Sequence, residues 1–314
     1  MRTRDTLSIL ATGIGLFAVV SCGSNSKDTP LTSDTVTQSG ASTADAMLSQ
    51  GRALQAAGKN GKAISIYKKI YKKYPYADAA AEALFEQGQI LDQKGDLIKA
   101  FDAYQNVIGR YHGSRHYKTA LNRQEAVAHA AANGIIKNSF LGMKTRISPQ
   151  KVEKMLLNVR DNAPRAASAP KAQYAIGRVW QEEGNSSRAI AAYQQVGLEY
   201  PSSSEAPEAL YQQGEILVLK AKRGNQNTAH VDRARDIYQE LIQRYSSHSR
   251  AADARKRLAM LGGQDVQRSY ETGEFYRKKG QNKAAIFYYR EVLRKTKSGS
   301  HYDLAKQRIS ELGG

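Results

Sequence analysis

The side chains that could carry out chemistry are few and scattered. Six histidines occur, and none belongs to a His-Glu-x-x-His pair of metal ligands. His112 and His116 lie four residues apart, but in a turn between expected helices, where two exposed histidines are the simpler interpretation than a metal site. No Gly-x-x-x-x-Gly-Lys-Ser/Thr phosphate loop and no Gly-x-Ser-x-Gly nucleophile turn is present. The sequence therefore predicts no enzyme, no cofactor and no metal site.

The single cysteine, Cys22, stands where it could be modified covalently. One cysteine excludes an internal disulfide and a multi-cysteine metal cluster. Residues 1–21 combine two arginines near the start, an apolar run of about 14 residues and small residues at the end, which is the order of a secretory signal. A bilayer span needs roughly 20 apolar residues, so a permanent transmembrane helix is disfavoured.

The ending Val19-Val20-Ser21-Cys22 resembles a bacterial lipobox. We therefore predict a lipoprotein signal peptide over residues 1–21, with Cys22 acylated, for example by palmitate, as the first residue of the mature chain. Gly23 follows, and by the same resemblance it favours the outer membrane, with the protein on the periplasmic side. A buried core cysteine or an ordinary signal peptide is the alternative. The stretch 22–43 is rich in Ser, Thr and Gly and is expected to be a disordered tether.

A repeated pattern organises the rest of the chain. The first set of six marker residues is Gly51, Gly58, Ala63, Tyr67, Tyr74 and Leu84. The same residue types recur 37 residues later, and again 126 residues after the first set. Partial copies follow around Gly214 and Gly273. Pro after the last tyrosine ends a helix, because it disfavours helical geometry in the residue before it. Each copy is therefore expected to be a helical hairpin of the tetratricopeptide type.

Two units depart from this regularity. A degenerate unit has its first helix at about 118–133 and its second at 151–163, separated by an insertion over 134–150 in which Ser148-Pro149 is a good helix start. A later unit carries eight extra residues within 223–230. We expect N-terminal repeats over 44–133 and C-terminal repeats over 151–314.

The fold class predicted is all-α, a solenoid of about six tetratricopeptide-type hairpins, one of them degenerate. The repeated Gly and Ala should let two helices approach closely, and the Tyr four residues after the Ala should fill the gap between neighbouring units. An unrelated all-α bundle would not produce a constant step.

The first helices of such units line an extended concave face. Counting from the repeated glycine gives a mixed polar and aromatic set, suited to reading a peptide. A solvated helix face is the alternative for each member. The candidate residues are Arg52, Gln55, Gln89, Asp92, Gln93, Tyr174, Arg178, Gln181 and Glu182.

The lipobox, the tether and repeats such as Tyr74-Pro75 and Tyr200-Pro201 together resemble the BamD family of outer-membrane assembly lipoproteins, also called YfiO or ComL. The resemblance implies a scaffold that binds a BamA-like barrel-assembly protein through its later repeats and unfolded outer-membrane proteins through its first ones. The insertion and the six units, where the family usually has five, are departures. A CpoB-like adaptor that coordinates peptidoglycan synthesis is the alternative, although residues 23–43 lack the heptads of a coiled coil.

The net charge of the chain helps to choose among classes of binding partner. The chain has a net charge of +18, and residues 214–314 hold 21 Lys and Arg against 11 Asp and Glu. In the cytoplasm such a surplus would favour nucleic acid. Export argues against nucleic acid, and leaves anionic lipid head groups, an acidic partner or a solvated face.

Overall fold

A computed structural model describes residues 38–134, 139–140, 143–144, 146–223 and 228–314. The predicted signal peptide, Cys22 and most of the predicted tether lie outside the described residues. Within the described part, the chain forms thirteen α-helices and one pair of short strands. No helix there is long and apolar enough to cross a membrane.

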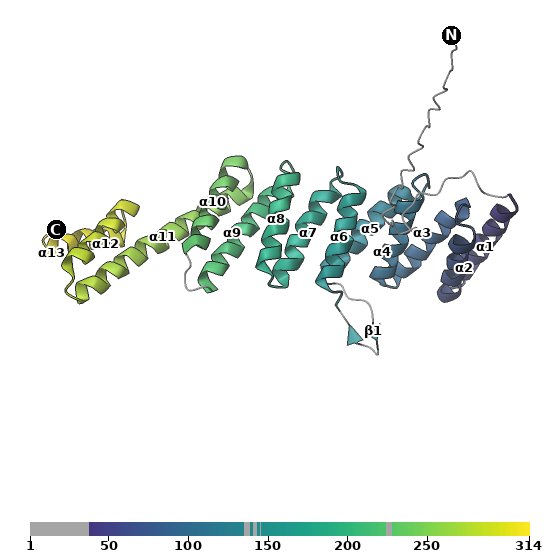
Figure 1. The fold of residues 1–314 in the computed structure, drawn as a ribbon, viewed down its shortest axis with the longest axis horizontal. Helices are drawn as coiled ribbons and strands as arrows, with labels where there is room; N and C mark the ends of the chain where they lie inside the picture. The colour runs from purple at the N-terminus through teal and green to yellow at the C-terminus, as the bar shows by residue number, and fades with distance from the viewer. Residues whose placement is uncertain (1–37, 135–138, 141–142, 145, 224–227) are drawn as a thin grey trace, which may run out of the picture.

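The first twelve helices form six consecutive hairpins stacked along one axis, with the thirteenth at the C-terminal end (Figure 1). This confirms the tetratricopeptide-type solenoid. We number the hairpins one to six. Their helices are α1 (Gln38–Ala56) and α2 (Asn60–Lys73), α3 (Asp78–Gln93) and α4 (Leu97–Arg110), α5 (Tyr117–Ala132) and α6 (Pro149–Asn162), α7 (Ser168–Glu182) and α8 (Ser186–Glu199), α9 (Glu205–Arg223) and α10 (Thr228–Arg244), α11 (Ser249–Lys278) and α12 (Asn282–Lys295), followed by α13 (Ser300–Glu311).

A glycine and a tyrosine close five of the six hairpins. The tyrosine of the second helix is fully buried and its ring lies directly on the glycine of the first helix. A Cβ atom on Gly88 would lie 2.7 Å from Cε1 of Tyr104, and one on Gly273 would lie 2.6 Å from Cε1 of Tyr289. The tyrosine thus fills the gap within its own hairpin, and the expectation that it fills the gap between units was wrong. Glycine is required because any larger side chain would displace the ring.

The second glycine of each repeat has another role. Gly95 and Gly184 have φ of 69° and 77°, which is the left-handed region that favours glycine. Each lies just past the end of a first helix and donates its N–H back to that helix, from Gly95 to the carbonyl of Asp92 and from Gly184 to that of Gln181. These glycines make the turn, and close helix approach does not explain them.

A second class of tyrosines joins neighbouring hairpins. The tyrosine that ends a second helix donates a hydrogen bond to the backbone carbonyl of the proline that follows the second helix of the preceding hairpin. The hydroxyl of Tyr111 donates to the carbonyl of Pro75 at 2.9 Å, and that of Tyr245 donates to the carbonyl of Pro201 at 2.6 Å. Both tyrosine classes pack a ring against the protein and use the hydroxyl, which favours Tyr over Phe at these positions.

Hairpin three is the degenerate unit, and it lies where the sequence places it. The helix start at Ser148-Pro149 is confirmed, because the Ser148 side chain accepts from the backbone N–H of Lys151 and Pro149 is the first helical residue. In place of a Gly–Tyr contact, the buried Gln124 hydrogen-bonds with Gln105 and Asn162. Within the predicted insertion, β1 (Ser139–Phe140) and β2 (Met143–Lys144) pair antiparallel.

Two boundaries differ from the prediction. Helix α1 begins at Gln38, so residues 38–43 of the predicted tether are helical. Ala41 and Ala44, one of them buried, favour this extension because alanine loses little entropy in a helix. The eight extra residues of hairpin five mainly lengthen its helices, since α9 and α10 have 19 and 17 residues against 15 and 14 in α7 and α8.

Helix α11 departs most from the repeat. It is 30 residues long and serves hairpin five with its first half and hairpin six with its second half (Figure 1). The large apolar core ends at Leu261, and a separate small core around Tyr289 begins with Val266. Between them stand Gly262 and Gly263, where an added Cβ would meet nothing within 4 Å. Hairpin six and α13 therefore form a module connected to the array mainly by one helix.

Candidate partner-binding groove

The first helices of neighbouring hairpins pack side by side, α5 on α7, α7 on α9 and α9 on the first half of α11. They form one face of the array, as the repeat predicts. A groove of about 690 Å³ runs across this face. We call it the central groove, and it is lined by Glu125, His129, Asn133, Lys171, Tyr174, Ala175, Arg178, Ser204, Glu205, Glu208 and His248.

Tyr174 and Arg178 lie one helical turn apart on α7, in the middle of the central groove. The Tyr174 ring packs against the ring of Tyr193, with 5.2 Å between centroids, and burial raises the pKa of its hydroxyl. Arg178 hydrogen-bonds to the side-chain oxygen of Asn133 on α5. An aromatic ring and a fixed guanidinium are the side chains most often found where proteins bind peptides.

Acidic and basic groups alternate across the central groove. Glu208 on α9 forms an ion pair with Arg250 at 2.9 Å, and the guanidinium of Arg250 stacks 4.5 Å from the ring centroid of Tyr211. Glu125 and Glu205 face Lys171 and Arg178 along the same lining. This mixture suits a peptide backbone with varied side chains better than a ligand of one charge.

His129 on α5 contributes an uncharged imidazole to one wall of the central groove. Burial lowers its pKa, and the charges of Arg178 and Lys171 act in the same direction against Glu125. Its Nε2 atom is buried without a hydrogen-bond partner in the described structure. The imidazole is therefore neutral near pH 7, and it could accept or donate one hydrogen bond to a bound chain.

The other predicted face residues hold the array together. Gln55 and Gln181 accept hydrogen bonds from the hydroxyl groups of Tyr67 and Tyr193, each at 2.7 Å. Asp92 forms an ion pair with Arg123 at 2.6 Å. These side chains do lie on first helices, but their hydrogen-bonding groups are occupied within the protein.

Arg52 and the remaining candidates lie outside the central groove. Arg52 forms ion pairs with Glu82 and Glu86 of the next hairpin, and Glu182 pairs with Arg146 at 3.4 Å. Gln89 is half-buried and Gln93 is exposed. A role for these residues in peptide binding stays a prediction.

The sequence analysis did not single out most of the groove lining. Glu125 and His129 were missed because hairpin three has no repeated glycine from which to count. Lys171 lies six residues before Gly177 of hairpin four, outside the positions that were counted. His248 and Glu205 lie at helix starts, which the counting also omits. Of the lining, counting found Tyr174, three residues before Gly177, and Arg178, one residue after it.

Of the two histidines expected to be exposed, His112 is exposed and His116 is not. The His116 ring stacks on Phe85, with 4.3 Å between centroids, and its Nε2 lies 3.3 Å from a carboxylate oxygen of Glu82. Among the residues that the structure describes, no group of three or more His, Cys, Asp or Glu side chains could hold a metal ion.

Comparison with known families gives two matches. Residues 148–303 match YfiO, described as an outer membrane lipoprotein, and residues 48–115 match a tetratricopeptide repeat. The first match covers hairpins four to six together with α6, and it includes the groove residues of α7, α9 and α11.

Among characterised proteins, the outer membrane protein assembly factor BamD of Caulobacter vibrioides is 28% identical over 112 residues. That match covers 36% of this chain and 37% of the relative. Solved structures with a similar course include a tetratricopeptide repeat protein from Parabacteroides merdae, 13% identical over 86% of this chain and 99% of that one, with a TM-score of 0.32. YrrB, a tetratricopeptide repeat protein with an unusual peptide-binding site, is 14% identical over 67% and 90%, with a TM-score of 0.33.

Proposed function

Because this chain is a YfiO-like tetratricopeptide repeat protein of the BamD type, we propose that it is a lipid-anchored scaffold on the periplasmic side of the outer membrane. In this proposal it binds partner proteins during the assembly and insertion of barrel proteins, and it performs no catalysis. The observation that carries the proposal is the position of the central groove, most of whose lining lies inside the segment that matches the lipoprotein family.

The central groove would hold an extended segment of its partner. The aromatic ring of Tyr174 offers a stacking surface, and Arg178 and Lys171 offer donors to backbone carbonyls or carboxylates, while Glu205 offers an acceptor. Unfolded outer-membrane proteins and a segment of a BamA-like protein are the expected occupants. Outer-membrane proteins in transit are extended chains, and an open groove across several first helices fits them.

The anchor is tested separately from the groove. We expect the wild-type chain to incorporate labelled palmitate and to fractionate with the outer membrane, and the Cys22→Ala variant to do neither. Mass spectrometry of the mature N-terminus checks the same point. An unacylated chain that remains in the membrane fraction would contradict the proposed lipid anchor at Cys22. That result would not bear on binding in the central groove, which the next experiment tests.

The binding role is tested by co-purification from detergent-solubilised membranes. We expect a BamA-like barrel protein to co-purify with the wild-type chain. The double variant Tyr174→Ala, Arg178→Glu should reduce binding of an unfolded outer-membrane protein about tenfold, because it removes an aromatic anchor and reverses a charge in the middle of the groove. Arg233→Glu, which makes the same charge change on the exposed side of α10, is the control. Recovery of peptidoglycan-synthesis enzymes in place of a barrel protein would favour the CpoB-like adaptor.

A further inference from the structure

One face of hairpin six is left open where the comparable face of hairpins two, four and five is covered. The residue two positions after the repeated glycine points toward the preceding hairpin, and in hairpins two, four and five it is buried, with Ile90, Val179 and Ile216 between 1% and 5% exposed. Ile90, for example, belongs to the apolar cluster of α1 and α2. In hairpin six this residue is Phe275, and it is 51% exposed.

The fused helix α11 is the physical reason. The segment that precedes the second half of α11 is the first half of the same helix, and it continues in line, so it cannot pack beside the second half. Ala53 of hairpin one occupies the same position and is also exposed, and among the described residues hairpin one is the first of the array. Hairpin six thus has an uncovered face of the kind found at the end of an array, although five hairpins precede it in the chain (Figure 1).

A groove lies against this open face. We call it the junction groove, and it has a volume of about 300 Å³. Val218 and Ala221 of α9, Val231 of α10 and Leu261 of α11 give it an apolar floor. The lengthened ends of α9 and α10 form one wall and the second half of α11 forms the other, so the two irregularities of the repeat meet at this place.

The wall from α11 has the pattern of a helix-packing ridge. Gln264, Arg268, Glu271 and Phe275 follow one another at spacings of four, three and four residues, so they lie on one face of the helix. The first three line the junction groove, and Phe275 continues the ridge one turn further. The ridge covers about three helical turns, or roughly 17 Å at 1.5 Å per residue.

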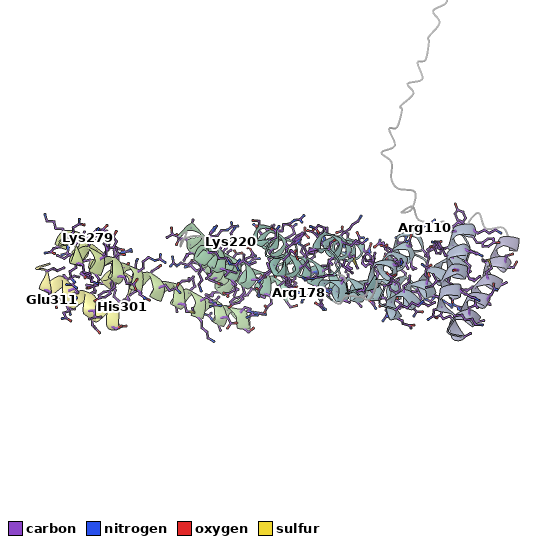
Figure 2. All side chains as sticks on the ribbon, turned by 90° about the horizontal axis from the view of Figure 1, so that it is seen from below. Arg110, Arg178, Lys220, Lys279, His301 and Glu311 are labelled. Atoms are coloured by element: carbon purple, nitrogen blue, oxygen red, sulfur yellow. The ribbon has the colours of Figure 1, made fainter. Side chains whose placement is uncertain are left out.

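The charge of the junction groove is positive. Lys222 on its rim forms no ion pair within the described structure, and Arg268 approaches Asp265 only to 4.0 Å. Lys279 lies 4.5 Å from the ring centroid of Phe275. Glu271, the carboxylate in the lining, already accepts a hydrogen bond from Gln267 at 2.8 Å. Lys220 and Lys279 flank the junction, one on each side (Figure 2).

We propose that the junction groove binds an acidic amphipathic helix of a partner protein. The partner helix takes the place of the missing hairpin: its apolar stripe covers Phe275 and lies on the apolar floor of the groove, and its carboxylates face Lys222, Arg268 and Lys279. A helix is the occupant because the corresponding face of hairpins two, four and five is covered by helices, and the carboxylates follow from the surplus of cations around the groove. This proposal does not depend on the peptide-binding role of the central groove.

The test measures fluorescence anisotropy of a labelled peptide with the full-length chain in detergent. The probe is a 16-residue helical peptide with Leu at spacings of four, three and four residues and Glu at the flanking positions. A second peptide with Lys in place of each Glu is its control. We expect saturable binding of the Glu peptide and at least about tenfold weaker binding of the Lys peptide.

Two exposed phenylalanines provide a matched pair of variants. Phe275 and Phe287 are 51% and 59% exposed, and each meets a neighbouring tyrosine edge-on at 5.3 Å, but Phe287 lies on α12 and is not part of the ridge. Phe275→Ala should weaken binding about tenfold, as loss of an aromatic anchor does, and Phe287→Ala by less than about twofold. Arg268→Glu should also weaken it.

Three results would overturn the proposal. One is absence of saturable binding by the Glu peptide, and another is equal weakening by Phe275→Ala and Phe287→Ala. The third is a dimer in sedimentation experiments that Phe275→Ala dissociates, because a second copy of the chain would then be the occupant. Circular dichroism of both variants should match the wild type, since both side chains are exposed.

Discussion

The first and last hairpins of the array make the same Gly–Tyr contact and complete it with different chemistry. In hairpin one, Tyr67 donates to the neutral side chain of Gln55 at 2.7 Å. In hairpin six, Tyr289 donates to the carboxylate of Glu274 at 2.6 Å. Hairpin four follows the first pattern with Gln181, and hairpin five follows the second with Glu215.

The difference comes from two positions in the sequence. The residue four after the repeated glycine is Gln55 in hairpin one and Gln181 in hairpin four, and both can accept a hydrogen bond. It is Val218 in hairpin five and Arg277 in hairpin six, which cannot accept one. The hydroxyl there turns to the residue one after the glycine, which is a glutamate in both.

The glutamates require countercharges, and these tie the last units to charged neighbours. Glu274 accepts from Arg277 at 2.8 Å and from Arg308 of α13 at 3.1 Å. Hydrogen bonding from Arg277, together with Tyr289 and the charge of Arg308, lowers the pKa of Glu274 to about 2 against the opposing effect of burial. The Gly–Tyr packing is thus shared along the array, whereas its completion depends on a charged group in hairpins five and six. Ion pairs also occur in the first hairpins, where hydrogen bonds from Arg115 and Arg52 lower the pKa of Glu82 against the effect of burial.

The largest effect is expected from filling a repeated glycine inside the array. Gly177→Ala would place a Cβ 2.5 Å from the ring of Tyr193, and we expect it to lower the free energy of unfolding by roughly 3 kcal/mol. Gly273→Ala should cost less, about 1 to 2 kcal/mol, because hairpin six is open on one side and can shift. Urea unfolding measures both.

Gly197→Ala in α8 is the control for that pair. An added Cβ there meets nothing within 4 Å, so the variant should be stabilised by up to about 1 kcal/mol. Equal costs at Gly177 and Gly273 would show that the interior and the end of the array are equally rigid.

Acid should loosen the C-terminal module. The pKa of Glu274 is below its unfolded value of 4.5, so the unfolded state binds protons first as the pH falls. The stability that Glu274 contributes is present above pH 4.5 and is lost as the pH falls toward 2. We expect amide hydrogen exchange in α12 and α13 to accelerate over that window.

The variant Glu274→Gln tests the cause of this acid response. It keeps an acceptor for Tyr289 and removes the charge, so it should cost about 1 to 2 kcal/mol within the module at pH 7. It should also flatten the pH dependence of exchange in α12 and α13, with exchange in α1 and α2 the same as in the wild type. An unchanged pH dependence would mean that other carboxylates govern the module.

A smaller and favourable effect is expected at the middle of α11. Gly263→Ala should raise stability by about 1 kcal/mol, because a mid-helix glycine costs backbone entropy and no neighbour occupies the space of the added Cβ. Thermal unfolding measures the gain. A loss of stability at Gly263 would indicate that α11 is bent there in solution.

The smallest effect should separate the two ways of completing the Gly–Tyr contact. Tyr67→Phe leaves the half-buried amide of Gln55 without its partner and should cost about 1 kcal/mol. Tyr289→Phe leaves Glu274 with its two arginines, so we expect a cost of only about 0.5 kcal/mol. Differential scanning calorimetry on the two variants compares them, and the reverse order would contradict the assignment.

The constant spacing of small and aromatic residues was sufficient to predict the solenoid, the number of hairpins and the start of α6 at Ser148-Pro149. These follow from local rules, because a helical hairpin can be recognised from its own turn and packing residues. The candidate site was predicted less well. Counting from each glycine found Tyr174 and Arg178, but it also selected Gln55 and Gln181, whose hydrogen-bonding groups serve the tyrosines.

The sequence by itself therefore determined the repeat, the positions of its glycines and tyrosines, the surplus of positive charge and the position of Cys22 at the end of an apolar run. Only the tertiary structure decided which polar residues of a first helix are free to bind, because a partner 12 or more residues away takes up the others. The tertiary structure also decided that α11 runs without a break from hairpin five into hairpin six, where the repeat would place a turn. Gly262 and Gly263 lower helix propensity there, and packing of the two halves of α11 against different cores keeps them helical.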